Sequence, residues 1–218
     1  MSFDTGATFG FLLFDGAEEL DFAGPWELAG LWSRHAGGPT HCLVVSESGG
    51  PVNCAQGLKV HADAAFEDCP NLDYLLIPGG EGTRKAVNNP ALLAFISAQA
   101  RHCRSLLSVC TGSLVLQAAG LLEGRQATTY WGLLDTLRQR GVEVVEERFV
   151  HDDPVWTSAG VSAGMDMLLA FIAHTAGEDT AAQVQFLAEY YPDDQVYGTP
   201  GDHPQAPAYV RRRSDKSR

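Results

Sequence analysis

The residue best suited to chemistry in this sequence is Cys110, in the segment SLLSVCTGS. The apolar run at residues 105–109 predicts a strand, and helical character resumes at once at residue 111, with no loop between them. Such a tight turn tends to strain the backbone of its first residue and to expose its side chain at the sheet edge. The helix start also offers unpaired N–H groups that favour a thiolate. We interpret Cys110 as a nucleophile; a buried structural cysteine is the alternative.

Three acids, Glu18, Glu19 and Asp21, follow the first apolar run in the segment GAEELD. Acids at a helix start commonly complement the helix dipole, which is one interpretation here. Asp21 is flanked by two large apolar side chains, which indicates partial burial. A carboxyl group close to Cys110 could share a proton with the sulfur and pass it to a substrate. Asp21 is therefore the candidate acid.

Gly79 and Gly80 follow another apolar run, at residues 73–78. Without side chains, their backbone N–H groups can approach a ligand closely. The amides of Gly80 and Thr111 could together stabilise negative charge that develops on a substrate. A tight turn with no binding role is the alternative. Glu81, beside this turn, is interpreted as a solvated loop acid; a second carboxylate in the crevice is the alternative.

Strands alternate with helices along the chain, and the best strands are solid apolar runs. This pattern predicts an α/β fold with a mostly parallel sheet and helices on both faces. Ligands bind such sheets outside the carboxyl ends of the strands, where residues 15–21, 79–82 and 110–112 would share one crevice. We expect strands at residues 8–14, 41–46, 58–61, 73–78, 105–109, 142–149 and 155–158, and helices at residues 21–33, 90–102, 111–122, 130–140, 162–176 and 178–190.

Length and composition predict a single folded domain over residues 1–198, followed by a polar basic tail at residues 199–218. The net charge is −12; the tail carries +3, which leaves −15 on the body. An acidic body disfavours binding to nucleic acid. We interpret the basic tail as a solvated, frayed end.

The five cysteines are odd in number, show no CxxC spacing and form no His/Cys cluster that suggests zinc. The sequence shows no secretory signal and no apolar run of membrane-spanning length. We therefore expect a cytoplasmic protein with reduced cysteines and no membrane or nucleic-acid partner.

The motifs GAEELDFAGP, IPGG, SVCTGSLVLQAAGLL, ATTYW and SAGVSAGMDM together resemble the ThiJ/PfpI superfamily. The resemblance covers most of residues 8–190, and within the superfamily it is strongest to the isocyanide (isonitrile) hydratases. It implies a flavodoxin-like, class I glutamine amidotransferase-like fold with a cysteine at a nucleophile elbow. It also implies a homodimer that needs no metal or organic cofactor.

Carried over by position, the resemblance makes Cys110 the nucleophile and Asp21 the acid and base beside it. The hydroxyl of Thr111 would form a hydrogen bond with the group attached to the sulfur of Cys110. The amides of Gly80 and Thr111 would form the anion-stabilising site. The implied reaction is hydration of an isocyanide to an N-substituted formamide through a covalent thioimidate. Tyr130 and Trp131, in the ATT-x-W stretch, would line the substrate pocket, although core packing is the alternative for Trp131.

Two departures from the wider superfamily bear on the activity. Thr111 follows the cysteine where other members have a histidine, and Tyr130 stands where related sequences place one. We interpret His41, His102 and His151 as surface or structural residues, so the sequence lacks a histidine placed to pair with Cys110 as in a Cys-His peptidase or glyoxalase.

Two alternatives stay open. One is a related cysteine enzyme acting on α-oxoaldehydes or glycated adducts. The other is an oxidation- or ligand-sensing module, as in regulators that join this fold to a helix-turn-helix region, although the segment after residue 191 is short for such a reader.

Overall fold

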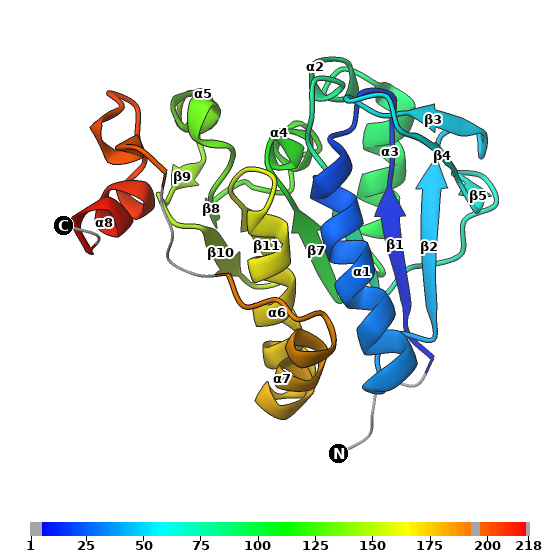
Figure 1. Cartoon of the computed structure of the whole chain (residues 1–218). Helices are drawn as coiled ribbons and strands as arrows, with labels where there is room; N and C mark the ends of the chain where they lie inside the picture. Colours follow the sequence, from blue (N-terminus) through cyan, green and yellow to red (C-terminus); the bar gives the residue numbers. More distant parts are fainter. Residues whose placement is uncertain (1–5, 193–196, 217–218) are drawn as a thin grey trace.

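The protein folds around one seven-stranded sheet, seen in a computed structural model that describes residues 6–192 and 197–216 (Figure 1). The strand order is β10-β11-β7-β6-β1-β2-β5. Neighbouring strands are parallel except β10 and β11, which are antiparallel, so the predicted α/β class is confirmed. The strands are β1 (Thr8–Leu12), β2 (His41–Ser46), β5 (Ala64–Ala65), β6 (Tyr74–Ile77), β7 (Ser105–Ser108), β10 (Phe149–Asp152) and β11 (Val155–Ser158).

Two hydrophobic clusters, one on each face, explain why the central strands are apolar throughout. Alternate residues of β6 point to opposite faces: Leu76 joins one cluster and Leu75 the other. Helices α1 (Glu19–His35), α6 (Ala163–Ala176) and α7 (Glu178–Leu187) cover the first face, and α3 (Pro90–Gln99) and α4 (Gly112–Ala118) cover the second.

The smaller elements lie around the ends of the sheet. A hairpin of β3 (Pro51–Asn53) and β4 (Lys59–His61) lies by the carboxyl ends of β1 and β2 (Figure 1), and β8 (Gln126–Ala127) pairs with β9 (Glu143–Val144). The remaining helices are α2 (Thr83–Ala86), η1 (Trp131–Leu133), α5 (Leu134–Gln139), η2 (Pro200–Asp202) and α8 (Ala208–Lys216).

Three sequence expectations differ from the structure. The strand expected at residues 142–149 is split, because β9 ends at Val144 and β10 begins only at Phe149. The helix expected at residues 111–122 ends at Ala118. The tail is not frayed over its described part: α8 forms there, beside β8 and β9, with Ala206 buried just before it. Among the described residues, no helix is both long enough and apolar enough to cross a membrane.

Candidate active site

Three loops at the carboxyl ends of β1, β6 and β7 are joined by hydrogen bonds. The N–H of Glu18 donates to the carbonyl of Gly79 at 3.0 Å, and the N–H of Gly80 donates to Oγ1 of Thr111 at 3.0 Å. A Cβ on Gly79 would lie 2.4 Å from the backbone nitrogen of Thr111, so only glycine permits this approach. The structure therefore brings together residues 15–21, 79–82 and 110–112, as the sequence predicts.

Cys110 occupies the strained point of this arrangement. It lies between the last residue of β7 and the first residue of α4, with a φ of 58°, in the left-handed region that few side chains adopt. Its N–H donates to the carbonyls of Ser158, at 3.2 Å, and Ala159, at 3.1 Å, which fix the turn against the end of β11. The residue is only 6% exposed, yet it lines a cavity of about 630 Å³. The sulfur is therefore held in place with one open side.

Asp21 lies in the first turn of α1 and is fully buried next to Cys110. Its Oδ2 accepts a hydrogen bond from the N–H of Gly79 at 2.8 Å, whereas Oδ1 has no well-formed partner among the described residues. Burial raises the pKa of this carboxyl group to about 7. The Gly79 bond opposes the rise, nearby Glu18 adds to it, and contacts with the Cys110 thiol and the Val161 N–H lower it again. Asp21 is thus poised to exchange a proton near neutral pH.

Burial also raises the pKa of the Cys110 thiol, which opposes the effect expected from the helix start. Loss of water, together with the charge of the neighbouring Asp21 carboxylate, raises the pKa of Cys110 to about 12. The N–H groups of Thr111 and Val161 lower it in part. A helix end contributes about 0.3–1 kcal/mol, whereas full burial can shift a pKa by about 3–5 units, so desolvation wins. The N–H group at the helix start favours the thiolate, as the sequence predicts, but burial outweighs it, so the pKa of the thiol stays raised beside the carboxyl group of Asp21.

Val161 is a candidate site residue that the sequence did not reveal. It lies between β11 and α6 with a φ of 50°, a genuine outlier for a β-branched residue. It lines the same cavity as Cys110. Its N–H lies near enough to the Cys110 sulfur and the Asp21 carboxyl group to lower the pKa of each. The SAGVSAGMDM motif contains Val161, but nothing in its residue types marks a backbone donor.

The expected anion-binding pair is arranged differently from the prediction. The Gly80 N–H is already engaged by the hydroxyl of Thr111, which also shares a 2.8 Å hydrogen bond with the hydroxyl of Thr83. The Thr111 side chain therefore braces the Gly80 turn, and its own N–H is the group that reaches the sulfur. In this structure, the donors at the sulfur are the N–H groups of Thr111 and Val161.

The cavity has an apolar side and a charged side. Val87, Leu114, Leu133 and Tyr130 contribute apolar or aromatic surface. The charged lining comes from two acids and two arginines: Glu18, Glu81, Arg84 and Arg140. This volume accommodates a small organic molecule with a hydrophobic body.

Tyr130 and Trp131, predicted together, lie in different places. Tyr130 lines the cavity at Cys110. Trp131 instead lines a neighbouring cavity of about 420 Å³ beside residues 204–208, and its ring lies 5.3 Å from that of His203.

No histidine lines the cavity in the described part of the chain. His41 and His102 are exposed, and His151 stacks on Trp156 with ring centroids 3.9 Å apart, next to His174. Residues 6–192 and 197–216 also hold no group of three potential metal ligands. Among the described residues, Asp21 is therefore the buried carboxyl group that lies against the Cys110 thiol.

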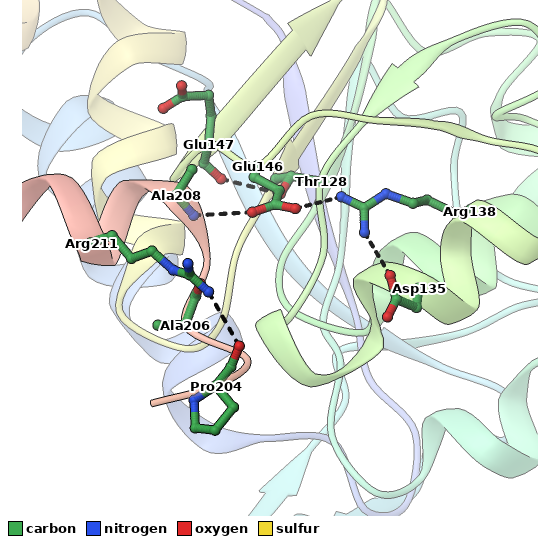
Figure 2. A network of polar contacts seen from close by, with 9 residues as sticks. All are labelled: Thr128, Asp135, Arg138, Glu146, Glu147, Pro204, Ala206, Ala208 and Arg211. Carbon is green, nitrogen blue, oxygen red and sulfur yellow. Dashed lines mark hydrogen bonds and ion pairs between the residues drawn. The ribbon is translucent and has the colours of Figure 1, made fainter. Parts of the chain in front are cut away.

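The C-terminal segment approaches the site from the opposite side to α1. Oε2 of Glu146 accepts a hydrogen bond from the N–H of Ala208 at 3.0 Å, and its Oε1 pairs with Arg138 at 2.6 Å (Figure 2). This contact anchors the start of α8. Tyr209, the next residue, is half-buried within electrostatic reach of Cys110, and burial raises the pKa of its phenol. The polar, basic composition of residues 199–218 gives no sign that this segment packs near the site.

Comparison with known proteins agrees with the geometry. The DJ-1/PfpI family model matches residues 8–174. The isonitrile hydratase of Pseudomonas putida is 41% identical over 184 residues, which cover 84% of this chain and 78% of that protein. The HTH-type transcriptional regulator CdhR of Pseudomonas aeruginosa is 35% identical over 81% of this chain, but the match spans about half of the regulator (53%). A glutathione-independent glyoxalase of Caenorhabditis elegans, 27% identical over 65% of this chain, and a deglycase of Pyrococcus abyssi, 31% identical over 55% of it, also match.

Solved structures show the same fold. The crystal structure of a THiJ/PfpI family protein from Pseudomonas syringae superposes with a TM-score of 0.83 at 32% identity, over 97% of this chain and 90% of that one. From the family model, the identity to the hydratase and this superposition, it follows that the chain belongs to the DJ-1/PfpI family.

Proposed function

We propose that this protein hydrates isocyanides to N-substituted formamides, with Cys110 as the nucleophile and Asp21 as its proton partner. The observation that carries the proposal is the Cys110–Asp21 pair: a thiol that lines the cavity, with a fully buried carboxyl group in contact behind it. The similarity to an isonitrile hydratase supports the same chemistry.

The first half of the reaction adds the thiol to the isocyanide carbon. As the sulfur bonds to that carbon, the thiol proton passes to Asp21, whose pKa of about 7 suits it to accept and return a proton. Asp21 then protonates the same carbon, which gives a thioimidate, Cys–S–CH=N–R. The N–H groups of Thr111 and Val161 stabilise the negative charge on sulfur during the attack.

The second half releases the product. Water from the cavity adds to the thioimidate carbon, with Asp21 as the base, and the nitrogen gains a proton. Collapse of this adduct breaks the C–S bond, returns a proton to the sulfur and frees the formamide R–NH–CHO. One water molecule is consumed, and no oxidant or reductant is needed.

The apolar side of the cavity suits the organic group of the isocyanide. Val87, Leu114 and Leu133 offer surface for an alkyl or aryl body, and Tyr130 can pack against it. A glyoxalase or deglycase with a Cys-His pair is less well supported, because no histidine lines the cavity in the described residues.

The test is formamide production from cyclohexyl and para-nitrophenyl isocyanide, with methylglyoxal turnover measured beside it. We expect formamide from the wild type, none from Cys110→Ala and at least a 100-fold lower kcat for Asp21→Asn. Cys69→Ser, which changes a half-buried cysteine outside the cavity, is the control and should keep wild-type rates. Methylglyoxal turnover without formamide would reject the proposal in favour of the α-oxoaldehyde alternative. Tight isocyanide binding without turnover would support a ligand sensor instead.

We also propose that the protein works as a homodimer, as the family resemblance implies. Mass measurement in solution tests this: a dimer has twice the 23.4 kDa mass of the chain, and a value near 23.4 kDa at micromolar concentration would exclude it.

A further inference from the structure

The strained turn at Val161 is held from outside by a network that the reaction itself does not use. The turn, residues 160–162, joins the end of β11 to the start of α6. A β-branched residue with a φ of 50° keeps that conformation only when its surroundings fix it. The position of the Val161 N–H on the sulfur therefore depends on whatever fixes the turn.

Arg148 makes that connection. Its Nε donates to Oδ2 of Asp166, in the first turn of α6, and its Nη2 donates to the hydroxyl of Ser162 at 3.1 Å. Its backbone carbonyl accepts the N–H of Ala159 at 2.9 Å, and the carbonyl of Ala159 in turn accepts the N–H of Cys110. One residue thus contacts the chain on both sides of Val161.

Asp166 is itself fixed from a second element. The hydroxyl of Tyr190, beyond α7, donates to its Oδ1 at 2.9 Å, so both carboxylate oxygens are engaged. The Arg148 and Asp166 side chains are 30% and 25% exposed, which leaves the pair partly shielded from solvent and salt. A charge-assisted pair with both ends fixed defines a geometry more strongly than a free surface ion pair does.

We propose that Arg148 and Asp166 are positioning residues: by holding residues 160–162 they keep the Val161 N–H on the Cys110 sulfur and so favour formation of the thiolate. Neither side chain lines the cavity, so they act through the turn and not on the substrate. The proposal concerns the reactivity of the thiol and holds whichever substrate the site accepts.

Other groups also act on the sulfur, and the test must separate them. Asp21 and Glu18, from the start of α1, oppose ionisation of the thiol, and the Thr111 N–H favours it. Tyr209 approaches from α8, within reach of both Cys110 and Arg148. Substitutions at Arg148 and Asp166 leave Asp21, Glu18 and Thr111 unchanged.

The experiment measures alkylation of Cys110 by iodoacetamide from pH 6.5 to 9.5, followed by mass spectrometry of the peptide that carries it. Because the thiolate is the reacting form, the rate at a fixed pH falls tenfold for each unit by which the thiol pKa rises. For Arg148→Gln and for Asp166→Asn we expect a rate about tenfold lower across this range. The double variant should be no slower than either single one, because both act through one turn.

Two further variants supply the controls. Arg125→Gln removes a comparable arginine, which contacts Asp152 and the carbonyl of Asp153 on the far side of β10, and it should leave the alkylation profile unchanged. Arg148→Lys keeps the positive charge but lacks the planar guanidinium group that contacts Asp166 and Ser162 together. Its alkylation rate should therefore lie between those of Arg148→Gln and the wild type. With an isocyanide substrate, kcat should fall in the Arg148 and Asp166 variants while KM stays within about twofold.

The proposal is overturned if the alkylation profiles of Arg148→Gln and Asp166→Asn superimpose on that of the wild type. It is equally overturned if Arg125→Gln slows alkylation as much, because a general loss of stability would then explain the effect. If Arg148→Gln does not fold, Asp166→Asn and Ser162→Ala decide the question by the same criterion. Absence of isocyanide turnover in the wild type would contradict the proposed function but would leave this readout intact.

Discussion

Burying the carboxyl group of Asp21 places a cost on the folded state that depends on pH. Its pKa rises from 3.8 to about 7 on folding, so between these values the folded chain holds a proton that the unfolded chain has lost. The stability that this proton provides is complete below pH 3.8 and is lost as the pH rises to about 7. Each pKa unit corresponds to about 1.4 kcal/mol, so burying this carboxyl group costs the folded state a few kcal/mol at neutral pH.

Asp21→Asn should therefore stabilise the protein at neutral pH while it impairs turnover. Asparagine keeps the shape and can still accept the Gly79 hydrogen bond, but it carries no charge to bury. In urea unfolding, the free energy of unfolding of the variant relative to wild type should increase by about 2–4 kcal/mol from pH 4.5 to pH 8. A difference that does not change with pH would show that Asp21 does not titrate near 7 in the folded state.

Asp21 should also determine how kcat/KM falls at acidic pH. The Cys110–Asp21 pair can react when it holds one proton, whichever of the two groups carries it. When both groups are protonated, Asp21 cannot accept the thiol proton and the reaction stops. Since the pKa of Asp21 is about 7, kcat/KM should rise tenfold per pH unit below that value and level off above it. Rates measured from pH 5.5 to 8.5 with para-nitrophenyl isocyanide check this; a flat profile would exclude Asp21 as the proton acceptor.

At the scale of elements, the turn from β7 into α4 depends on a very close backbone approach at Gly112. A Cβ there would lie 2.2 Å from the carbonyl oxygen of Ile77, and backbone atoms of two packed elements cannot both move aside. Gly30, inside α1, has open space around its Cβ position. The same substitution should thus have opposite effects at the two sites.

We expect Gly112→Ala to destabilise the fold by about 1–3 kcal/mol and to reduce turnover, because the helix start that follows Cys110 must shift. Gly30→Ala should stabilise the protein by about 0.5–1 kcal/mol through helix propensity, with unchanged turnover. Thermal unfolding and formamide assays on both variants provide the comparison. Equal effects on stability would mean that the approach at Gly112 is not tight.

The elements that the sequence predicts well are those whose signal lies within the element itself. The apolar runs of β1, β6 and β7 are local signals, and the sequence predicts these three strands correctly. Helix α8 was missed because its composition is polar and its anchors, Glu146 and Glu147, lie about sixty residues away.

The polar details of the site were the least predictable part. That the Thr111 hydroxyl engages the Gly80 N–H depends on one side-chain rotamer and on a third residue, Thr83. Val161 acts through its backbone, and the residue type at such a position carries no signature of that role. Motif spacing therefore located the crevice but not the donors within it.

At the scale of the whole molecule, the sheet and the C-terminal segment differ in how they are held. The two hydrophobic clusters share the central strands β1, β6 and β7, so neither face can come apart while the other stays intact. Helix α8 lies beyond the β10 edge (Figure 1) and is held by Glu146 at the Ala208 N–H and by the ion pair of Arg212 with Glu147. Just before it, Ala206 and Pro207 are buried, and within it Tyr209 is half-buried.

Hydrogen exchange should reveal this difference directly. Amides of α8 should exchange well before those of β6, by local opening that leaves the sheet intact. Because exposed charge pairs hold α8, 0.5 M NaCl, which shortens the screening length to about 4 Å, should speed exchange in α8 and leave β6 unchanged. Helix α3, whose docking is apolar, serves as the matched control and should not respond to salt. If α8 exchanged only as slowly as β6, the segment that brings Tyr209 near Cys110 would belong to the cooperative core, and its position at the site would be as permanent as that of Asp21.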